Sequence, residues 1–484
     1  MFLPSKNEIE QSRRPGFLVP VYKEIDYFEE PAFYFERLRH RPFGFLLESA
    51  REHPETGRFS FLGAEPFLIF KSKGREIEIT KNGAKEKFRG NPILHLRSLF
   101  NNHKSVRLEG MPDFTGGAVG YFSYDIRHLF EALPSVAQDD LRLPDIYLCF
   151  YDTIAAYDHL KKKTLLISNV WPNGKLKNAY DKAVAKIDAL ETKIKRQSPE
   201  AKHSRPNGGG LKIHSTFTKN GFQDAVKRAK RYIKQGDIYQ ANLSQRLSVK
   251  SDTDAFRLYN ALRAINPSPF ASLLNFDGVK IVSSSPERLL KLQGRRLQTR
   301  PIAGTRPRGT SAGEDRTRSR NLLLSPKERA EHIMLVDLER NDLGRVCEYG
   351  SVRVDEKMVL EKYSHVIHIV SNVCGTLKKD KDRFDVIRAA FPGGTITGVP
   401  KVRCMEIIDE LEPVSRNIYT GSVGYLGFNG DMDLNIVIRT FLLKDGWAHV
   451  QAGAGIVADS DPQREYHETL FKAQALLESL KRCR

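Results

Sequence analysis

Short segments in which apolar and polar residues alternate recur along the chain, and this period of two is typical of strands that bury one face. Residues 76–80 (Glu-Ile-Glu-Ile-Thr) show it clearly, and the Lys-Asn-Gly sequence that follows them is typical of a hairpin turn. Residues 238–247 alternate in the same way. Short apolar runs predict further strands at 43–49, 59–63, 67–70, 116–121, 146–157, 164–170, 270–274, 279–283, 366–375, 421–428, 434–443 and 448–458.

Helices are expected between these strands. Apolar spacing and capping residues predict them at 176–194, 221–235, 254–265, 402–410 and 461–480, and one more begins at Ser325. The elements follow no regular strand–helix–strand period. We therefore expect an α+β (mixed α/β) fold, in which large, mostly antiparallel β-sheets form a sandwich-like core with helices packed outside.

The composition changes between residues 196 and 214. This segment contains Ser-Pro, Arg-Pro and Asn-Gly-Gly-Gly sequences, which are typical of a linker. It separates an N-terminal region, 1–195, from a second region, 215–484. Residues 1–20 contain three prolines, and we expect a poorly ordered lead-in there.

Charge and cysteine content narrow the classes of function. The net charge is +18, but lysine and arginine are spread along the chain without a nucleic-acid-binding motif. A basic solvated surface is therefore favoured over a nucleic-acid partner. The five cysteines include no Cys-x-x-Cys pair, which disfavours zinc and disulfide frameworks and is typical of the reducing cytoplasm. No apolar run is long enough to predict a membrane span.

Two distant segments share a pattern of acidic residues. Each starts with a capping residue and a proline, at 325–326 and 461–462, and then carries two glutamates three positions apart. The pairs are Glu328 with Glu331 and Glu465 with Glu468. Residues three apart share a helix face, so two facing helices would gather four carboxylates, a charge that Mg²⁺ would compensate. Ordinary solvated helix starts, balanced by nearby basic side chains, are the alternative.

Three glycine- or arginine-rich segments favour anion binding. Residues 392–401 combine glycines and hydroxyl groups before a helix, where backbone N–H groups can hold an anion. Glycines in 451–456 would let a ligand meet a strand backbone, and the arginines of 301–309 suit a carboxylate. A capped loop, close sheet packing and a solvated turn are the respective alternatives.

Three single residues add candidate chemistry. Arg439 lies within an apolar predicted strand, where its guanidinium needs a carboxylate from a ligand or from the protein. Glu287 follows an apolar strand and is either a general acid or a partner of Arg288. His368 lies in another apolar strand, so a catalytic role and a satisfied core position are both open.

Together, these segments resemble the chorismate-utilising enzymes, in particular anthranilate synthase component I and aminodeoxychorismate synthase component I. The matching segments follow the family's order and cover nearly the whole chain. They are 46–49, 116–121, 301–309, 328–332, 336–346, 391–401 and 452–455, together with Glu465 and Glu468. The resemblance implies a chorismate-binding catalytic domain at 215–484 and an N-terminal region of the anthranilate synthase component I type.

The resemblance also implies roles for single residues. Glu331 and Glu468 would bind Mg²⁺, with Glu328 and Glu465 holding the waters of the ion, and the ion would bind the ring carboxylate of chorismate. His368 and Glu287 match acid–base positions, Thr305 a neighbour of the ring, and Lys472 a pocket lysine. The implied substrate-binding residues are Gly304, Arg306, Gly394, Thr395, Tyr419, Arg439, Gly453, Ala454 and Gly455.

Residues near the expected site divide between two products. Asn242 and segments 270–272, 283–288 and 430–436 resemble aminodeoxychorismate synthases, which make 4-amino-4-deoxychorismate for p-aminobenzoate and folate. Ala303 stands where many of those enzymes carry the lysine that attacks C2, and alanine is the usual anthranilate synthase residue. We expect 4-amino-4-deoxychorismate, with anthranilate and pyruvate of the tryptophan pathway as the alternative.

Regulation and partners also follow from the resemblance. Glu48, Ser49, Pro267 and Tyr425 resemble the tryptophan pocket of anthranilate synthase. Because no glutaminase nucleophile motif is recognisable, ammonia is expected from a separate glutamine amidotransferase subunit, component II. The expected partners are chorismate and this subunit, without nucleic acid or membrane, and the expected compartment is the cytoplasm.

Overall fold

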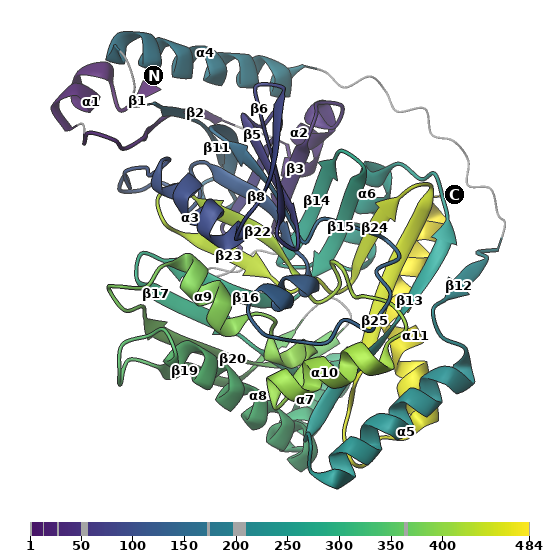
Figure 1. Ribbon diagram of the computed structural model, residues 1–484. Coiled ribbons are helices and arrows are strands. Elements are labelled where there is room, and N and C mark those ends of the chain that lie inside the picture. Colours follow the sequence, from purple (N-terminus) through teal and green to yellow (C-terminus); the bar gives the residue numbers. More distant parts are fainter. Residues whose placement is uncertain are drawn as a thin grey trace.

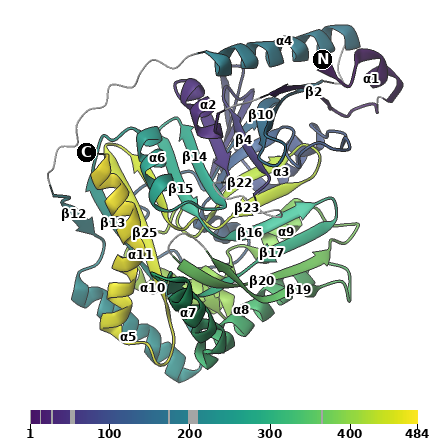
Figure 2. The same ribbon diagram turned by 180° about the vertical axis from the view of Figure 1, so that it is seen from behind.

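The structure is a computed structural model that describes residues 2–12, 14–26, 29–49, 57–171, 175–196, 210–362 and 366–483. These residues form two large antiparallel sheets with helices packed around them (Figure 1). The two sheets lie against each other, as the reverse view also shows (Figure 2). Among the described helices, none combines the length and the apolar character that a membrane span requires.

The first sheet has thirteen strands within the described residues. Their order is β1 (Phe2–Leu3), β2 (Val19–Asp26), β11 (Lys163–Val170), β10 (Thr153–Asp158), β4 (Phe59–Gly63), β3 (Gly44–Glu48), β14 (Phe270–Phe276), β15 (Val279–Ser285), β24 (Thr440–Lys444), β25 (Trp447–Ile456), β13 (Gln240–Lys250) and β12 (Ile213–Ser215). In addition, β21 (Gly398–Val399) pairs with β13. The β3–β14 pairing joins the N-terminal region to the second region.

The second sheet has twelve strands in the same part of the chain. Their order is β18 (Ile302–Pro307), β20 (Val366–Thr376), β17 (Arg296–Arg300), β16 (Arg288–Gln293), β23 (Met432–Asn435), β22 (Ser422–Gly427), β8 (Gly117–Phe122), β9 (Ile146–Tyr151), β5 (Leu68–Lys73), β6 (Glu76–Lys81) and β7 (Ala84–Arg89). A further strand, β19 (Arg353–Lys362), pairs with β20. Here the β8–β22 pairing joins the two regions, so both sheets are built from both regions.

Helices cover the outer faces of the sheets. The α-helices are α1 (Lys6–Ser12), α2 (Pro31–Leu38), α3 (Pro92–Asn101), α4 (Leu176–Lys195), α5 (Lys219–Gln235), α6 (Ala255–Ile265), α7 (Ala312–Leu324), α8 (Pro326–Gly344), α9 (Arg383–Ala390), α10 (Lys401–Leu411) and α11 (Pro462–Arg482), and two short 3₁₀ turns are η1 (Tyr124–Leu129) and η2 (Gly394–Ile396). Buried side chains of α2, α4, α6 and α11 pack on the first sheet, and those of α3, α8 and α9 on the second. Helices α4 and α5 lie at opposite ends of the molecule (Figure 1).

A continuous apolar layer fills the space between the sheets. It contains Phe45 of β3 and Leu274 of β14 from the first sheet, and Val119 of β8 and Val423 of β22 from the second. Facing strands that each bury an apolar surface against the other sheet form such a layer. The predicted α+β fold with a sandwich-like antiparallel core is confirmed.

Three local predictions were wrong. The predicted strand at 146–157 is two strands, β9 and β10, which belong to different sheets. The predicted lead-in at 1–20 contains ordered elements, because β1 pairs with β2 and α1 precedes that strand. The predicted single strand at 434–443 is two strands, β23 and β24, which belong to different sheets. Most residues of this apolar run are buried in one sheet or the other, so hydrophobicity does not reveal the break between the strands. The predicted linker lies mostly outside the described residues, and the domain division stays a prediction.

Truncation of a ring in the second sheet tests the packing of the core. Phe150 of β9 is fully buried and its ring lies 5.2 Å from that of Phe100. Because the cavity cannot collapse completely, Phe150→Ala should lower the free energy of unfolding by about 3–5 kcal/mol, measured by urea denaturation. The matched control is Phe33→Ala on α2, whose ring is 53% exposed. A similar loss in both variants would contradict this placement of the core.

Candidate active site

Helices α8 and α11 begin as predicted. The side chain of Ser325 accepts a hydrogen bond from the backbone N–H of Glu328 at 3.4 Å, and that of Asp461 accepts one from the N–H of Arg464 at 2.9 Å. A proline follows each cap. The first turn of each helix thus carries an acidic side chain, Glu328 or Glu465, where the helix dipole stabilises negative charge.

The two acidic helix starts meet at the ends of the paired strands β13 and β25. Gln240, at the start of β13, donates a hydrogen bond to Glu331 of α8 at 3.3 Å. Lys472 of α11 pairs with Glu468 at 2.8 Å and donates to the backbone oxygen of Gly453 in β25 at 2.9 Å. The charge of Lys472 also lowers the pKa of Glu331. One lysine therefore acts on glutamates from both helices.

Burial and the neighbouring acid on the same helix shift the pKa values of these glutamates. Burial raises the pKa of Glu331, and the charge of Glu328 raises it further. Burial likewise raises the pKa of Glu465, with a contribution from Glu468. Arg306 balances part of this charge, since it pairs with Glu328 at 3.0 Å. Basic side chains thus lie near these glutamates, as expected for ordinary solvated helix starts. The two glutamates at each helix start still repel each other.

The donor set fits a hard cation with an open coordination shell. Within the described residues, no three histidine, cysteine, aspartate or glutamate side chains are grouped tightly enough to hold a metal ion. Mg²⁺, however, usually takes one or two protein carboxylates and completes its shell with water and substrate oxygens. Glu331 of α8 and Glu468 of α11 are the candidate carboxylates, and they are linked by Lys472, which pairs with Glu468 and lowers the pKa of Glu331.

Neighbouring side chains pack closely against the glycines of strand β25. A Cβ atom on Gly453 would lie 2.8 Å from the hydroxyl of Tyr419, and one on Gly455 would lie 2.6 Å from the amide nitrogen of Gln240. Neither position tolerates a side chain without a shift of its neighbours. Ala454 between them belongs to the apolar core under α5 and α10. The glycines are thus explained by Tyr419 and Gln240, whose side chains lie close to one face of the strand.

Arg439 lies in the link between β23 and β24, not inside a strand as predicted. Its backbone has a φ of +51°, in the left-handed region. Its positive charge lowers the pKa of Glu287 and that of His368, so the guanidinium lies near both. The crossing between the sheets therefore places a cation beside the two candidate acid–base residues.

Glu287 and His368 are both buried, and burial drives both towards their neutral forms. Burial raises the pKa of Glu287 to about 7, although the Thr395 hydroxyl and the N–H of Ile302, at 3.5 Å, favour the carboxylate. Burial lowers the pKa of His368 to about 4, and its Nδ1 donates to the backbone oxygen of Gly304 at 3.3 Å. At neutral pH, His368 is uncharged and Glu287 can either donate or accept a proton.

The segment 301–309, for which a solvated turn was the alternative to anion binding, is mostly strand β18. Thr305 lies opposite His368 and Ala303 opposite Ile369 in β20. The register shifts between Ala303 and Thr305, at Gly304, whose φ is +68°. This irregularity places Arg306 against the acidic start of α8.

The glycine- and threonine-rich segment is a tight loop around η2. A Cβ atom on Gly394 would come within 2.1 Å of Leu338 in α8, so this glycine is required for packing. The hydroxyl of Thr397 closes the loop by donating to the backbone oxygen of Gly393 at 2.8 Å. The loop thereby holds Thr395 beside Glu287.

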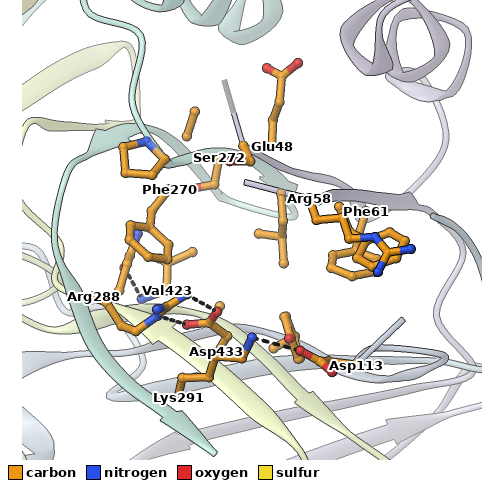
Figure 3. Close-up of a pocket in the computed structure, with 18 of the residues that line it drawn as sticks. Glu48, Arg58, Phe61, Asp113, Phe270, Ser272, Arg288, Lys291, Val423 and Asp433 are labelled. Atoms are coloured by element: carbon orange, nitrogen blue, oxygen red, sulfur yellow. Dashed lines mark hydrogen bonds and ion pairs between the residues drawn. The ribbon is translucent and has the colours of Figure 1, made fainter. Parts of the chain in front are cut away.

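A separate cavity of about 310 Å³ lies between the sheets (Figure 3). Glu48, Ser49 and Tyr425, which the sequence placed in a tryptophan pocket, line it. Pro267 is not among its lining residues, and Pro269 takes a place there. Pro267 and Pro269 lie two residues apart in the same turn. The path of the backbone decides which of them reaches the cavity, and the sequence alone does not show that path.

The cavity has a polar wall and a buried acid. Arg288 pairs with Asp433 at 3.0 Å, and Lys291 pairs with Asp113 at 2.9 Å (Figure 3). The carboxylate of Glu48 points away from these pairs (Figure 3). It is held instead by Tyr259 and Arg263 on α6.

Sequence reasoning missed Gln240. It is 5% exposed and contacts both Glu331 and the position of Gly455. The only signal was a glutamine at the start of an otherwise buried alternating strand. Its contact with α8 depends on a pairing of elements 91 residues apart.

Comparisons with known proteins show which family this chain resembles. The family model described as "chorismate binding enzyme" matches residues 46–478. Anthranilate synthase component 1 of Acetivibrio thermocellus is 44% identical over 99% of this chain and 99% of its own length. Aminodeoxychorismate synthase component 1 of Bacillus subtilis (strain 168) is 44% identical over 97% of each chain.

Solved structures share the fold. Anthranilate synthase component I from Streptococcus pneumoniae TIGR4 superposes with a TM-score of 0.79 at 34% identity, over 88% of this chain and 93% of that one. The isochorismate synthase MenF from Escherichia coli has a TM-score of 0.72 over 98% of each chain, and at 17% identity it shows the fold alone.

These matches define a class of chorismate-utilising enzymes. The chain belongs to the chorismate binding enzyme family. Its relatives carry two different names, anthranilate synthase component 1 and aminodeoxychorismate synthase component 1, at the same identity. The family is therefore established, while the product has to be argued from residues.

The titration of Glu287 gives a prediction about stability. Its pKa rises from 4.5 in the unfolded chain to about 7 in the folded protein. The stability that this group contributes is complete below the unfolded value and is lost as the pH rises through the folded value. Glu287→Gln should remove this loss, so the variant should gain roughly 3 kcal/mol on the wild type between about pH 4.5 and pH 7.5.

The measurement is urea denaturation of both proteins across that pH interval. Glu86→Gln, at an exposed position of β7, is the control and should follow the wild type. Parallel stability curves for Glu287→Gln and wild type would show that the pKa of Glu287 is not raised.

Proposed function

We propose that the protein aminates chorismate with ammonia in a Mg²⁺-dependent reaction that gives 4-amino-4-deoxychorismate. One observation carries the proposal: acidic helix starts from α8 and α11 converge beside the glycines of β25. Such a site suits a dicarboxylate, because a metal can neutralise one carboxylate and protein donors can hold the other.

The metal would be held by glutamates from both helices. Glu331 and Glu468 would bind Mg²⁺ directly, and Glu328 and Glu465 would hold its waters. When bound, the ion supplies charge neutralisation and positioning for the ring carboxylate of chorismate. Gln240 supports this arrangement, since its hydrogen bond orients Glu331.

The remaining groups would grip the substrate. Tyr419, Arg439 and the backbone N–H groups of 453–455 would hold the enolpyruvyl carboxylate, because guanidinium and N–H donors suit carboxylate oxygens. Gly394 and Thr395 would lie beside the ring carboxylate, and Gly304, Thr305 and Arg306 beside the ring. Lys472 already donates to the backbone of β25 and would hold that strand against α11.

Proton transfer would fall to Glu287 and His368. Loss of a hydroxyl group from the ring requires a proton, and a carboxyl group whose pKa is about 7 can supply one at neutral pH. His368 stays neutral beside Arg439 and can hydrogen-bond without competing for that proton.

The product is proposed from residues around the site. Asn242, one of the positions that resemble aminodeoxychorismate synthases, lies against Gly453: its Oδ1 is 2.4 Å from a Cβ built there. Anthranilate is the second candidate, and Ala303 favours it. Alanine at this buried position cannot provide the nucleophile that would direct ammonia to C4 by a covalent route.

Partners and regulation complete the proposal. Ammonia would come from a separate glutamine amidotransferase subunit, since the relatives are named as component 1 of their synthases. The reaction would run in the cytoplasm. The cavity around Ser49 and Tyr425 would take tryptophan, whose ring suits the aromatic wall and whose charged ends suit the paired arginine, lysine and aspartates.

Substitution of the metal-binding pair tests the site. Glu331→Gln and Glu468→Gln should each lower kcat/KM for chorismate about 100-fold or more, because each removes a charged oxygen ligand. Chorismate loss with ammonium should also stop on addition of EDTA and resume with excess Mg²⁺. Glu478→Gln, at an exposed position of α11, should keep wild-type activity. Wild-type rates for Glu331→Gln and Glu468→Gln would remove the metal assignment.

Identification of the product decides between the two reactions. Wild-type protein with chorismate, Mg²⁺ and ammonium should form p-aminobenzoate only after an aminodeoxychorismate lyase is added, as followed by chromatography. Anthranilate fluorescence without any lyase would instead establish the second candidate.

A further inference from the structure

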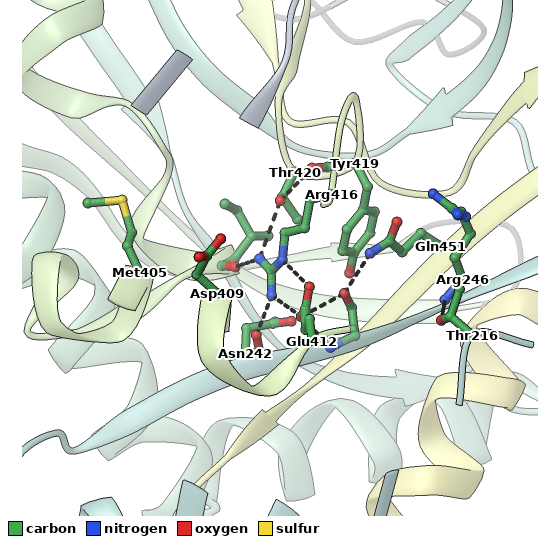
Figure 4. A network of polar contacts seen from close by, with 12 residues as sticks. Thr216, Asn242, Arg246, Met405, Asp409, Glu412, Arg416, Tyr419, Thr420 and Gln451 are labelled. Atoms are coloured by element: carbon green, nitrogen blue, oxygen red, sulfur yellow. Dashed lines mark hydrogen bonds and ion pairs between the residues drawn. The ribbon is translucent and has the colours of Figure 1, made fainter. Parts of the chain in front are cut away.

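A buried arginine ties the segments of the proposed site together. Arg416 is 2% exposed and lies at the centre of a polar network behind Tyr419 (Figure 4). Neither the acidic pattern nor the glycine pattern of the sequence points to it. A fully buried guanidinium is costly unless its charge and its hydrogen-bond donors are all satisfied.

All five N–H donors of Arg416 have acceptors, and these come from four segments. Nε and one Nη2 donor bind the two carboxylate oxygens of Glu412 at 2.9 and 2.6 Å. The other Nη2 donor binds the backbone oxygen of Asn242 at 2.5 Å. The two Nη1 donors bind the backbone oxygen of Ile396 at 2.9 Å and the hydroxyl of Thr420 at 3.3 Å.

The three acceptor residues other than Glu412 lie next to residues of the proposed site. Ile396 follows Thr395 in the glycine-rich loop, and Thr420 follows Tyr419. Asn242 lies in β13 directly opposite Gly455. The guanidinium therefore links the loop, the tyrosine turn and the glycine strand at fixed distances.

The network continues beyond the arginine. Glu412, which ends α10, also accepts from the backbone N–H and the hydroxyl of Ser244 at 2.8 Å. The hydroxyl of Ser244 in turn accepts from the amide of Gln451 in β25 at 2.9 Å (Figure 4). The Arg416 guanidinium also lies 5.6 Å from the centre of the Tyr419 ring.

We infer that Arg416 is a positioning residue: its guanidinium fixes Tyr419, the Thr395 loop and the Gly455 strand relative to one another, and thereby determines the affinity of the site for a dicarboxylate. The inference rests on the proposed function for the identity of that ligand. Only an arginine side chain can bind all of these acceptors, because lysine offers a point charge on a flexible stem and no planar fork of donors.

Arg127 provides a matched comparison. It is also buried, at 3% exposure, pairs with Asp409 at 2.6 Å and donates to the backbone oxygen of Met405 at 3.3 Å. Arg127 and Arg416 lie 4.5 and 4.9 Å from the centre of the same ring, that of Tyr124. The acceptors of Arg127 are on α10, away from the residues of the site. The same substitution in both arginines separates positioning from general stability.

The first experiment compares Arg416→Lys with Arg127→Lys. Both should lower the midpoint of urea unfolding. Only Arg416→Lys should raise KM for chorismate, by about tenfold or more, with a smaller change in kcat. Equal KM shifts in the two variants, or an unchanged KM in Arg416→Lys, would overturn the inference. If Arg416→Lys does not fold, the carboxylate partners of the two arginines can be changed instead. Glu412→Gln, at the partner of Arg416, should then raise KM more than Asp409→Asn, at the partner of Arg127.

A coupling test asks whether Arg416 acts through Tyr419. In a Tyr419→Phe background, Arg416→Lys should raise KM by a clearly smaller factor than in the wild type, because the partner is already impaired. Full additivity would show that the arginine does not work through the tyrosine.

A readout without substrate keeps the inference separate from the proposed function. In protein labelled with 3-fluorotyrosine, the Tyr419 signal, assigned by its loss in Tyr419→Phe, should shift or broaden in Arg416→Lys and stay unchanged in Arg127→Lys. A wild-type protein that does not consume chorismate would refute the proposed function and leave this result standing. An unchanged Tyr419 signal in Arg416→Lys would refute the positioning role whatever the substrate is.

Discussion

The buried charge of Arg416 constrains the molecule at its centre. A guanidinium without solvent needs acceptors for all five of its N–H donors, and here they come from strand β13, the turn η2, the end of α10 and the residues before β22. Satisfying that requirement holds the glycine-rich loop, the Tyr419 turn and strand β13 in one arrangement. The proposed site would therefore depend on this buried polar network as well as on its individual binding residues.

The same strand serves both the proposed active site and the separate cavity. β22 begins three residues after Tyr419 and presents Val423, Gly424 and Tyr425 to the cavity. Its neighbour β8 leads into η1, which carries Tyr124 beneath Arg416. A ligand that displaced β22 would act on a strand bonded to both regions of the chain. This physical continuity explains why the N-terminal region cannot be regarded as an independent attachment.

Burial has opposite consequences for the two kinds of candidate catalytic group. It turns Glu287 into an acid that titrates near neutrality and keeps His368 uncharged, with Arg439 reinforcing the second effect. The glutamates of α8 and α11 are less enclosed than these two residues, but burial is still the largest cause that raises the pKa of Glu331 and of Glu465, and the neighbouring glutamate on the same helix raises each pKa further. The fold thus separates the candidate proton-transfer groups in the interior from the candidate metal-binding groups at the helix starts.

Local signals in the sequence determined the antiparallel class, the capped starts of α8 and α11 and the acidic pairs, because caps and periodicity act over a few residues. Other features came only from the tertiary structure. Among the elements, these are helix α7, whose apolar residues follow no clear helical period, the break between strands at 436–439 and strand β18 within segment 301–309. Among single residues, they are the place of Pro269 in the cavity wall and the contacts of Gln240 and Arg416. Each depends on which distant segment packs against it. The sequence thus determined which groups are present, and the packing of two sheets decided which groups share a site.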